Sequence, residues 1–213
     1  KFSGVAASVD CNNRWVKLDP YRGSIAAVAE ASRNVSCVGA LPIAITNNLN
    51  FSSPETEMGY WQLSSSCEGI TKACNILETP VTGGNVSLFN ESINDDGVVT
   101  PIQPTPVIGM VGVIDDVNKA VSTSWKNIND EIWIIGSSSS EITINASSYL
   151  EYTHGLIKGR PPIIELNDEK LCQKFLREAI LSDLILSSHD ISDGGLAIAL
   201  AECCILSAMG AFI

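Results

Sequence analysis

The segment Val81–Phe89 reads VTGGNVSLF, a predicted strand that is interrupted by two adjacent glycines. Glycine weakens a strand, so a glycine pair inside one indicates a bulge or a group that closely approaches the backbone. Asn85 follows the glycines with an amide oxygen of the kind that binds Mg²⁺. Ser87 lies two residues further on and therefore faces the same side of an extended strand. An ordinary bulge and a ligand site both remain open here.

A second polar segment, Thr46–Phe51 (TNNLNF), follows a short apolar run that predicts a buried strand at Leu41–Thr46. Functional groups often lie on loops that follow buried elements. Asparagine also accepts left-handed geometry and bonds to its own backbone, so plain turn chemistry explains the segment equally well. We expect a turn-rich loop at Asn47–Pro54.

A third segment, His189–Gly195 (HDISDGG), precedes a predicted helix. The free N–H groups of a helix N-terminus, together with glycines, form a natural anion site. A plain N-cap at Ser192 or Asp193 is the alternative. We interpret His189 as a hydrogen-bonded structural residue and His154 as a surface residue. With only two histidines and no G-x-S-x-G motif, a triad hydrolase has little support.

Hydrophobic periodicity and turn residues divide the rest of the chain into short strands and longer helices. Strands are predicted at Val5–Val9, Arg14–Leu18, Leu41–Thr46, Val81–Phe89, Pro106–Ile114, Glu131–Ile135 and Ile185–Ser188. Helices are predicted at Ser24–Val38, Glu57–Leu77, Asn145–Tyr152, Asn167–Ser182 and Leu196–Met209, with a turn at Gly136–Ser140. Polar residues accumulate between Asp115 and Asn129, which places a domain boundary near Asn127. The expected domains are residues 1–127 and 128–213.

The chain is acidic, with 213 residues, a formal charge of −11 and a pI of about 4.5. Nucleic acid and anionic membranes would repel it, so neither is expected as a partner. An anionic nucleotide is not excluded, since Mg²⁺ and backbone N–H groups can supply a local positive field. The seven cysteines form no C-x-x-C pair, which favours reduced structural thiols and a cytoplasmic location. No apolar run approaches the roughly 20 residues of a membrane helix.

Several strings together resemble one family. They occur in the order found in the second half of the formylglycinamide ribonucleotide amidotransferase (phosphoribosylformylglycinamidine synthase) large subunit. The strings are Asp19–Tyr21, Glu30–Asn34, Gly39–Pro42, Asn50-Phe51, Gly84–Glu91, Pro104–Pro106 and His189–Leu196. The resemblance covers nearly the whole chain, and the run GNVSLFNE is its most specific part.

The resemblance implies an α/β (α+β) fold: an aminoimidazole ribonucleotide synthetase-like N-terminal domain whose strands help build a barrel, then an incomplete C-terminal α+β domain. The family enzyme phosphorylates a substrate amide oxygen with ATP, and ammonia from a glutaminase then displaces the phosphate. The cofactors implied are ATP and Mg²⁺, and the substrate is formylglycinamide ribonucleotide.

The resemblance also implies roles for individual residues. Asn47 and Gly84 match ATP contacts, Asn85 matches a Mg²⁺ ligand and Ser87 matches a substrate contact. The matching loop, considered as a tentative phosphate or substrate contact, comprises His189, Asp190, Ser192, Asp193, Gly194 and Gly195.

The chain departs from the family pattern in three respects. Asn47 stands where the family usually has aspartate, and Ser52-Ser53 replace a usual Gly-Asn pair. The catalytic histidine segment and most Mg²⁺ carboxylates belong to an earlier N-terminal half that this sequence lacks, so we expect that half and a glutaminase as partners. A noncatalytic nucleotide-binding or scaffolding module is the alternative function. Another ATP-using superfamily member, such as a thiamine-phosphate or selenophosphate enzyme, would lack the NVSLFNE run.

Overall fold

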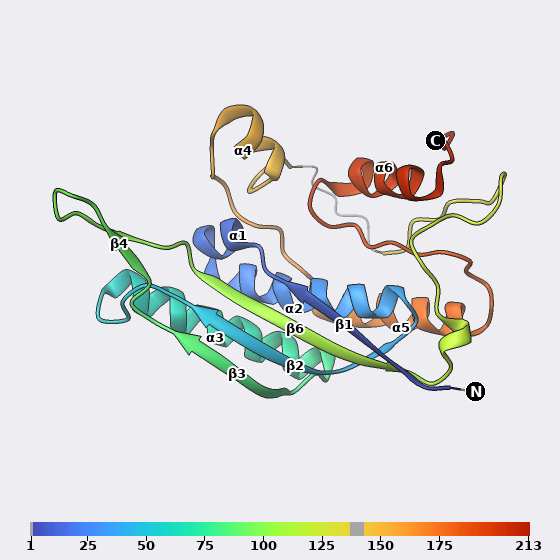
Figure 1. Ribbon diagram of the computed structural model, residues 1–213, viewed down its shortest axis with the longest axis horizontal. Helices are drawn as coiled ribbons and strands as arrows, with labels where there is room; N and C mark the ends of the chain where they lie inside the picture. The colour runs from blue at the N-terminus through green and yellow to red at the C-terminus, as the bar shows by residue number, and fades with distance from the viewer. Residues whose placement is uncertain (1, 137–142) are drawn as a thin grey trace.

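The computed structural model describes residues 2–136 and 143–213. Its centre is a four-stranded sheet in the order β1-β6-β2-β3 (Figure 1). The strands are β1 (Gly4–Asp10), β2 (Leu41–Asn50), β3 (Val81–Ser87) and β6 (Thr105–Ile114). β6 pairs antiparallel with β1 and β2, whereas β2 and β3 are parallel. A hairpin of β4 (Glu91–Ile93) and β5 (Val99–Pro101) projects from this sheet.

Two helices, α2 (Pro20–Cys37) and α3 (Glu57–Leu77), cover one face of the sheet. Burial alternates along β6: Ile108, Met110, Gly112 and Ile114 are buried on the helix side, whereas Val107, Gly109, Val111 and Val113 are only partly buried, and this alternation explains the arrangement. Helix α3 has the bounds predicted from the sequence. Helix α2 begins four residues earlier than expected, because Asp19 caps it and Pro20 occupies its first turn.

The opposite face of the sheet is open among the described residues. Its aliphatic side chains include Val5 and Val9, which are 76% and 71% exposed, and Leu41 and Ile43 at the start of β2. Large contiguous apolar patches are uncommon on monomeric proteins.

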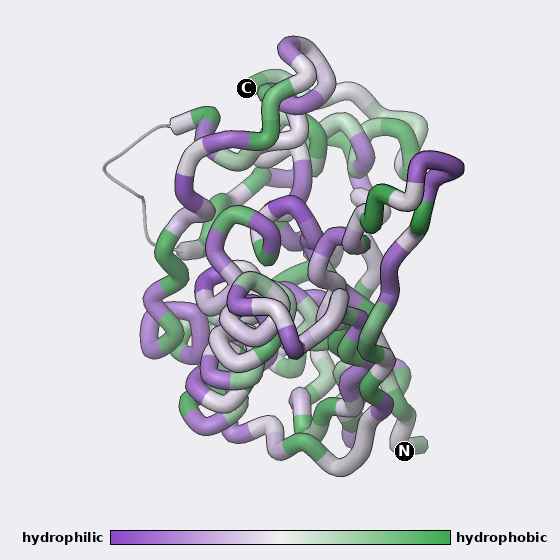
Figure 2. Tube along the Cα trace, turned by 90° about the vertical axis from the view of Figure 1, so that its left-hand side faces the viewer, coloured by the Kyte–Doolittle hydropathy of each residue, from purple (hydrophilic) through white to green (hydrophobic). Residues whose placement is uncertain are grey.

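The C-terminal part contributes η1 (Val117–Lys119), α4 (Ser148–His154), α5 (Leu166–Leu181) and α6 (Gly195–Ser207). Helix α5 packs on the outside of α2 and α3. Helix α6 is apolar around its circumference yet buries only Ala199 and Cys203. The C-terminal end of the chain, which is coloured hydrophobic in Figure 2, lies at the periphery of the molecule. Within the described residues, no helix combines the length and hydropathy that crossing a bilayer requires.

The predicted strand at Arg14–Leu18 is wrong, because these residues belong to helix α1 (Asn13–Leu18). Asn12 accepts a hydrogen bond from the backbone N–H of Trp15 at 3.2 Å and thereby caps the helix. A five-residue segment rich in Trp, Val and Leu satisfies strand propensity as well as helix periodicity. The asparagine cap determines the outcome.

Three other predictions need correction. The predicted loop at Asn47–Pro54 is strand up to Asn50, because both neighbouring strands supply ladder partners. Glu131–Ile135 forms no strand, since no neighbouring strand pairs with it, and Trp133 remains 78% exposed. Ile185–Ser188 contributes only the single bridge between Ser187 and Ser122. Of the turn predicted at Gly136–Ser140, residues 137–140 lie outside the described part of the chain.

Candidate functional site

The register of β2 and β3 brings the four predicted site residues together. Asn47 pairs with Gly84, the next pair is Asn48 with Asn85, and Asn50 pairs with Ser87. β3 is an edge strand whose side chains are mostly exposed. A row of polar groups therefore lies along an accessible edge of the sheet.

Gly84 is required by its contact with Asn47. A Cβ atom built on Gly84 would lie 2.1 Å from Asn47 Oδ1 and 2.8 Å from the Asn47 carbonyl oxygen. No atom lies within 4 Å of a Cβ built on neighbouring Gly83. The two glycines thus differ: Gly84 allows the asparagine to pack against the backbone, and Gly83 leaves the strand open to solvent.

Asn85 and Ser87 lie on the open face of the sheet. Asn85 Nδ2 donates to Asn48 Oδ1 at 3.1 Å, which leaves the Asn85 amide oxygen without a hydrogen bond to any described residue. That oxygen fits one position in a Mg²⁺ shell. The described residues contain no cluster of three or more His, Cys, Asp or Glu side chains suited to a metal. The Ser87 hydroxyl lies 3.1 Å from Asn90 Oδ1.

The predicted loop His189–Gly195 lies near the last residues of β1, whose sheet edge is opposite β3. Three strand spacings separate these edges, on the order of 14 Å, so the loop does not adjoin Gly84 and Asn85. Gly194, with φ +85°, occupies the N-cap position of α6, and neither Ser192 nor Asp193 caps this helix. The N-cap interpretation of those two side chains is therefore wrong.

The two ring nitrogens of His189 face acceptors on different segments. Nδ1 lies 2.7 Å from the carbonyl oxygen of Asp190, and Nε2 lies 3.1 Å from a carboxylate oxygen of Glu202 in α6. Asp190 itself is buried, and its Oδ2 atom has no hydrogen bond among the described residues. This pattern agrees with a hydrogen-bonded structural histidine. His154 is exposed, as expected.

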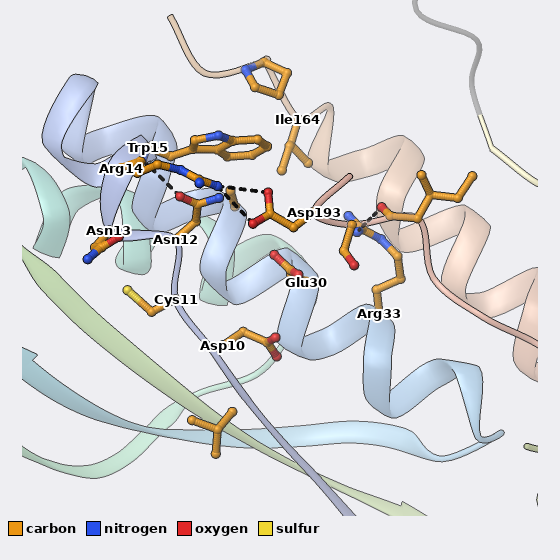
Figure 3. A pocket seen from close by; sticks show the side chains of 15 residues that line it. Asp10, Cys11, Asn12, Asn13, Arg14, Trp15, Glu30, Arg33, Ile164 and Asp193 are labelled. Carbon is orange, nitrogen blue, oxygen red and sulfur yellow. Dashed lines mark hydrogen bonds and ion pairs between the residues drawn. The ribbon is translucent and has the colours of Figure 1, made fainter. Parts of the chain in front are cut away.

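Ser192 and Asp193 line a cavity of about 500 Å³ together with the end of β1, α1 and α2 (Figure 3). Arg14 is its central cation. Nη1 bonds to Glu151 at 2.6 Å, and Nη2 bonds to Asp193 at 2.9 Å and to the Ser148 hydroxyl at 2.7 Å. One guanidinium from the N-terminal part thereby joins α4 and the loop before α6.

The floor of this cavity holds the carboxylates of Asp10 and Glu30 (Figure 3). Burial, together with the charge of Asp10, raises the pKa of Glu30 to about 7, while the charge of Arg33 acts in the opposite direction. Burial, aided by both carboxylates, raises the pKa of the Cys11 thiol to about 12. Cys11 is therefore a thiol at neutral pH and a poor nucleophile.

The sequence motifs do not single out this group of acidic and basic residues. Glu30 and Arg33 were only part of a matching string, and Arg14 was placed in a strand. The available signal was the occurrence of Glu30 and Arg33 among the buried, alanine-rich residues of helix α2. Charged residues are seldom buried without a partner, and Arg33 has one in Glu169 at 2.9 Å.

Both parts of the chain match models of one protein family. Residues 1–114 match the family described as AIR synthase related protein, N-terminal domain, and residues 127–213 match the corresponding C-terminal domain. The chain belongs to the AIR synthase related protein family. The predicted fold class is thereby confirmed.

Within this class the chain closely matches curated PurL subunits. It is 77% identical over 212 residues to phosphoribosylformylglycinamidine synthase subunit PurL of Prochlorococcus marinus (strain MIT 9312), covering 100% of this chain and 27% of that protein. The chain thus spans about a quarter of the length of the relatives it matches.

Solved structures of Thermotoga maritima PurL share the fold. The complex with FGAR superposes with a TM-score of 0.74 at 20% identity, covering 95% of this chain and 31% of that one. The complex with ATP and the PurLQS structure each give a TM-score of 0.50 at 32% identity, covering 56% of this chain and 19% of the other.

Proposed function

We propose that this chain is part of a phosphoribosylformylglycinamidine synthase. The reaction is the ATP-dependent conversion of formylglycinamide ribonucleotide to formylglycinamidine ribonucleotide with glutamine-derived ammonia, a step of purine biosynthesis. The observation that carries the proposal is the 77% identity with a PurL subunit along the whole chain. A T. maritima homologue bound to ATP and one bound to FGAR support the two substrates.

The polar edge formed by β2 and β3 is the proposed nucleotide contact. Asn47 and Gly84 would contact ATP, since the glycine leaves backbone accessible to a phosphate. Asn85 would supply one oxygen to a Mg²⁺ ion, which when bound neutralises phosphate charge. Ser87 would donate a hydrogen bond to the ribonucleotide substrate. The loop His189–Gly195 is proposed as a more distant contact that approaches phosphate or substrate only in the assembled enzyme.

The incomplete set of charged groups at this edge indicates that other chains complete the site. Phosphoryl transfer needs several metal ligands and charge-stabilising donors at one place. The polar edge offers one neutral ligand, Asn85, and the Ser87 hydroxyl. The exposed aliphatic face of the sheet is the proposed contact for the N-terminal half of the synthase. A glutaminase supplies ammonia, and the PurLQS assembly of T. maritima supports such a partner.

Calorimetric titration with Mg-ATP tests the nucleotide contact. Asn85→Ala should weaken binding about tenfold or more, the scale expected for one lost polar contact to a charged ligand. Asn75→Ala is the matched control, because Asn75 is exposed on α3 and makes no hydrogen bond through its side chain among the described residues. Equal affinities for the two variants would remove Asn85 from the site.

A phosphate-release assay with ammonia as the nitrogen donor tests the reaction. The chain alone should not turn over, and a mixture with the N-terminal half of a PurL subunit should produce the amidine. Substrate-dependent turnover by the chain alone would show that the active site lies elsewhere in it.

A noncatalytic nucleotide-binding or scaffolding module is the second candidate. Asn47 favours it, because an amide in place of the aspartate usual in the family removes one negative charge. Mg-ATP binding without any turnover in the mixture would support this alternative over the synthase.

A further inference from the structure

A second, smaller cavity of about 220 Å³ lies between α5 and the region where α3 ends and β2 begins. One wall of the cavity is formed by side chains of α5. Lys170, Gln173 and Arg177 recur at intervals of three and four residues, so they lie on the same face of the helix. Two of the three are cations, on a chain whose formal charge is −11.

Arg177 has no ion-pair partner among the described residues. Its one hydrogen bond to a described residue runs from Nη1 to the Ser36 hydroxyl at 2.8 Å. Guanidinium carries five N–H donors, so most of them remain available. Burial lowers the pKa of Arg177, while the charge of Glu178 acts in the opposite direction. A half-buried arginine without an ion-pair partner is costly unless an anion or water compensates it.

A buried polar network holds Arg177 in place. Gln173 is 3% exposed, and its Oε1 accepts hydrogen bonds from the hydroxyls of Ser32 at 2.7 Å and Ser36 at 3.3 Å. Ser36 in turn accepts from Arg177. Ser32, which also lines the cavity, is 1% exposed. The guanidinium is therefore positioned by buried groups of α2 and α5.

The facing wall limits the kind of ligand. Pro42, Ile43 and Leu77 contribute apolar surface, and Glu78 is the one carboxylate among the described residues that line the cavity. Glu78 pairs with Lys170 at 3.0 Å but is 76% exposed in its side chain, so it can move away into solvent. The cavity is too small for a nucleotide, whose sites usually exceed about 300 Å³.

We propose that this cavity binds a small organic anion, with one carboxylate or phosphate group on Arg177 and Lys170 and a body of a few carbon atoms on the apolar wall. Planar guanidinium donors match either anionic group. The site is separate from the polar edge of β2 and β3, so the synthase proposal can fail without affecting it.

The test is a titration of the 213-residue chain, followed by amide chemical shifts, with three probes: inorganic phosphate, butyrate and the neutral control butyramide. Saturable shifts at residues of α5 and at Leu41–Ile43 are expected with at least one anion and none with butyramide. If only phosphate saturates the shifts, the ligand is a phosphate ester. If only butyrate saturates them, the ligand is a carboxylate.

Variants locate the binding. Arg177→Gln should weaken it about tenfold or more, and Arg177→Lys should recover part of the loss because it restores the charge. Lys174→Gln, on the solvent side of α5, is the matched control and should leave affinity unchanged. The proposal is overturned if neither anion saturates, or if Arg177→Gln and Lys174→Gln bind alike while their spectra show the native fold.

Discussion

Arg14 and Asp193 lie 179 positions apart in the chain and form an ion pair at 2.9 Å. Arg14 is mostly buried, with 15% of its side chain exposed, whereas Asp193 is 60% exposed. The same guanidinium also binds Glu151 and Ser148. The pair therefore attaches the glycine loop before α6 to the helix that follows β1.

Replacing Asp193 with asparagine should loosen this loop. Because Asp193 is largely exposed, the expected loss of stability is only about 1 kcal/mol. The amide of Gly195, which donates to Ser192 at 3.0 Å, should exchange faster with solvent. Hydrogen exchange and urea unfolding measure the two effects.

A double-mutant cycle with Arg14→Gln separates the ion pair from other effects of the substitution. Asp95→Asn, at the exposed tip of the β4–β5 hairpin, is the control. Additive effects of the two substitutions would mean that the pair contributes nothing to stability.

Glu30 should make stability depend on pH. Its pKa is about 7 in the folded chain, against an ordinary value of 4.5. The folded state therefore binds more protons than the unfolded state between these values. The contribution of this group to stability is fully present below about pH 4.5 and is lost as the pH rises through about 7.

Glu30→Gln should flatten that dependence and raise stability at pH 8. Urea unfolding at pH 5 and pH 8 measures both. Glu68→Gln, on the exposed side of α3, is the control and should leave the pH dependence unchanged. A Glu30→Gln variant with the native pH dependence would argue against a protonated Glu30.

The two adjacent glycines of β3 should respond differently to alanine. Gly84→Ala places a methyl group against both the side chain and the backbone of Asn47, so a loss of about 1–3 kcal/mol is expected. Gly83→Ala meets open space and should change stability by no more than about 0.5 kcal/mol. Urea unfolding of both variants provides the comparison, and equal losses would contradict the close contact.

Trypsin should cut first after Lys126, within the polar connection predicted between Asp115 and Asp130. Lys126 and the residues to Asp130 are exposed and carry no regular structure. Trp125 is tied back by a hydrogen bond from its backbone N–H to the Ser207 hydroxyl at 2.7 Å. Mass spectrometry should therefore find fragments 1–126 and 127–213. An earlier cut after Lys72, inside α3, would contradict a two-domain organisation.

Long elements with a clear period were predictable from the sequence. Helix α3 follows from apolar residues at intervals of about 3.6, which burial of one face requires, and strand β6 follows from a short, nearly continuous apolar run. Short or partner-dependent elements were not. Helix α1 depends on the Asn12 cap, and the last residues of β2 are strand only because β3 and β6 lie on either side.

By itself the sequence determined the family, the positions of the main helices and the polar string around Asn85, because these depend on local residue order. Only the tertiary structure decided that Asn47 packs on Gly84, that Arg14 meets Asp193, and that Arg177 lines a cavity without a carboxylate partner among the described residues. Each of these depends on strand register or helix packing between distant segments. Register is set by the burial of whole faces, which no short stretch of sequence specifies.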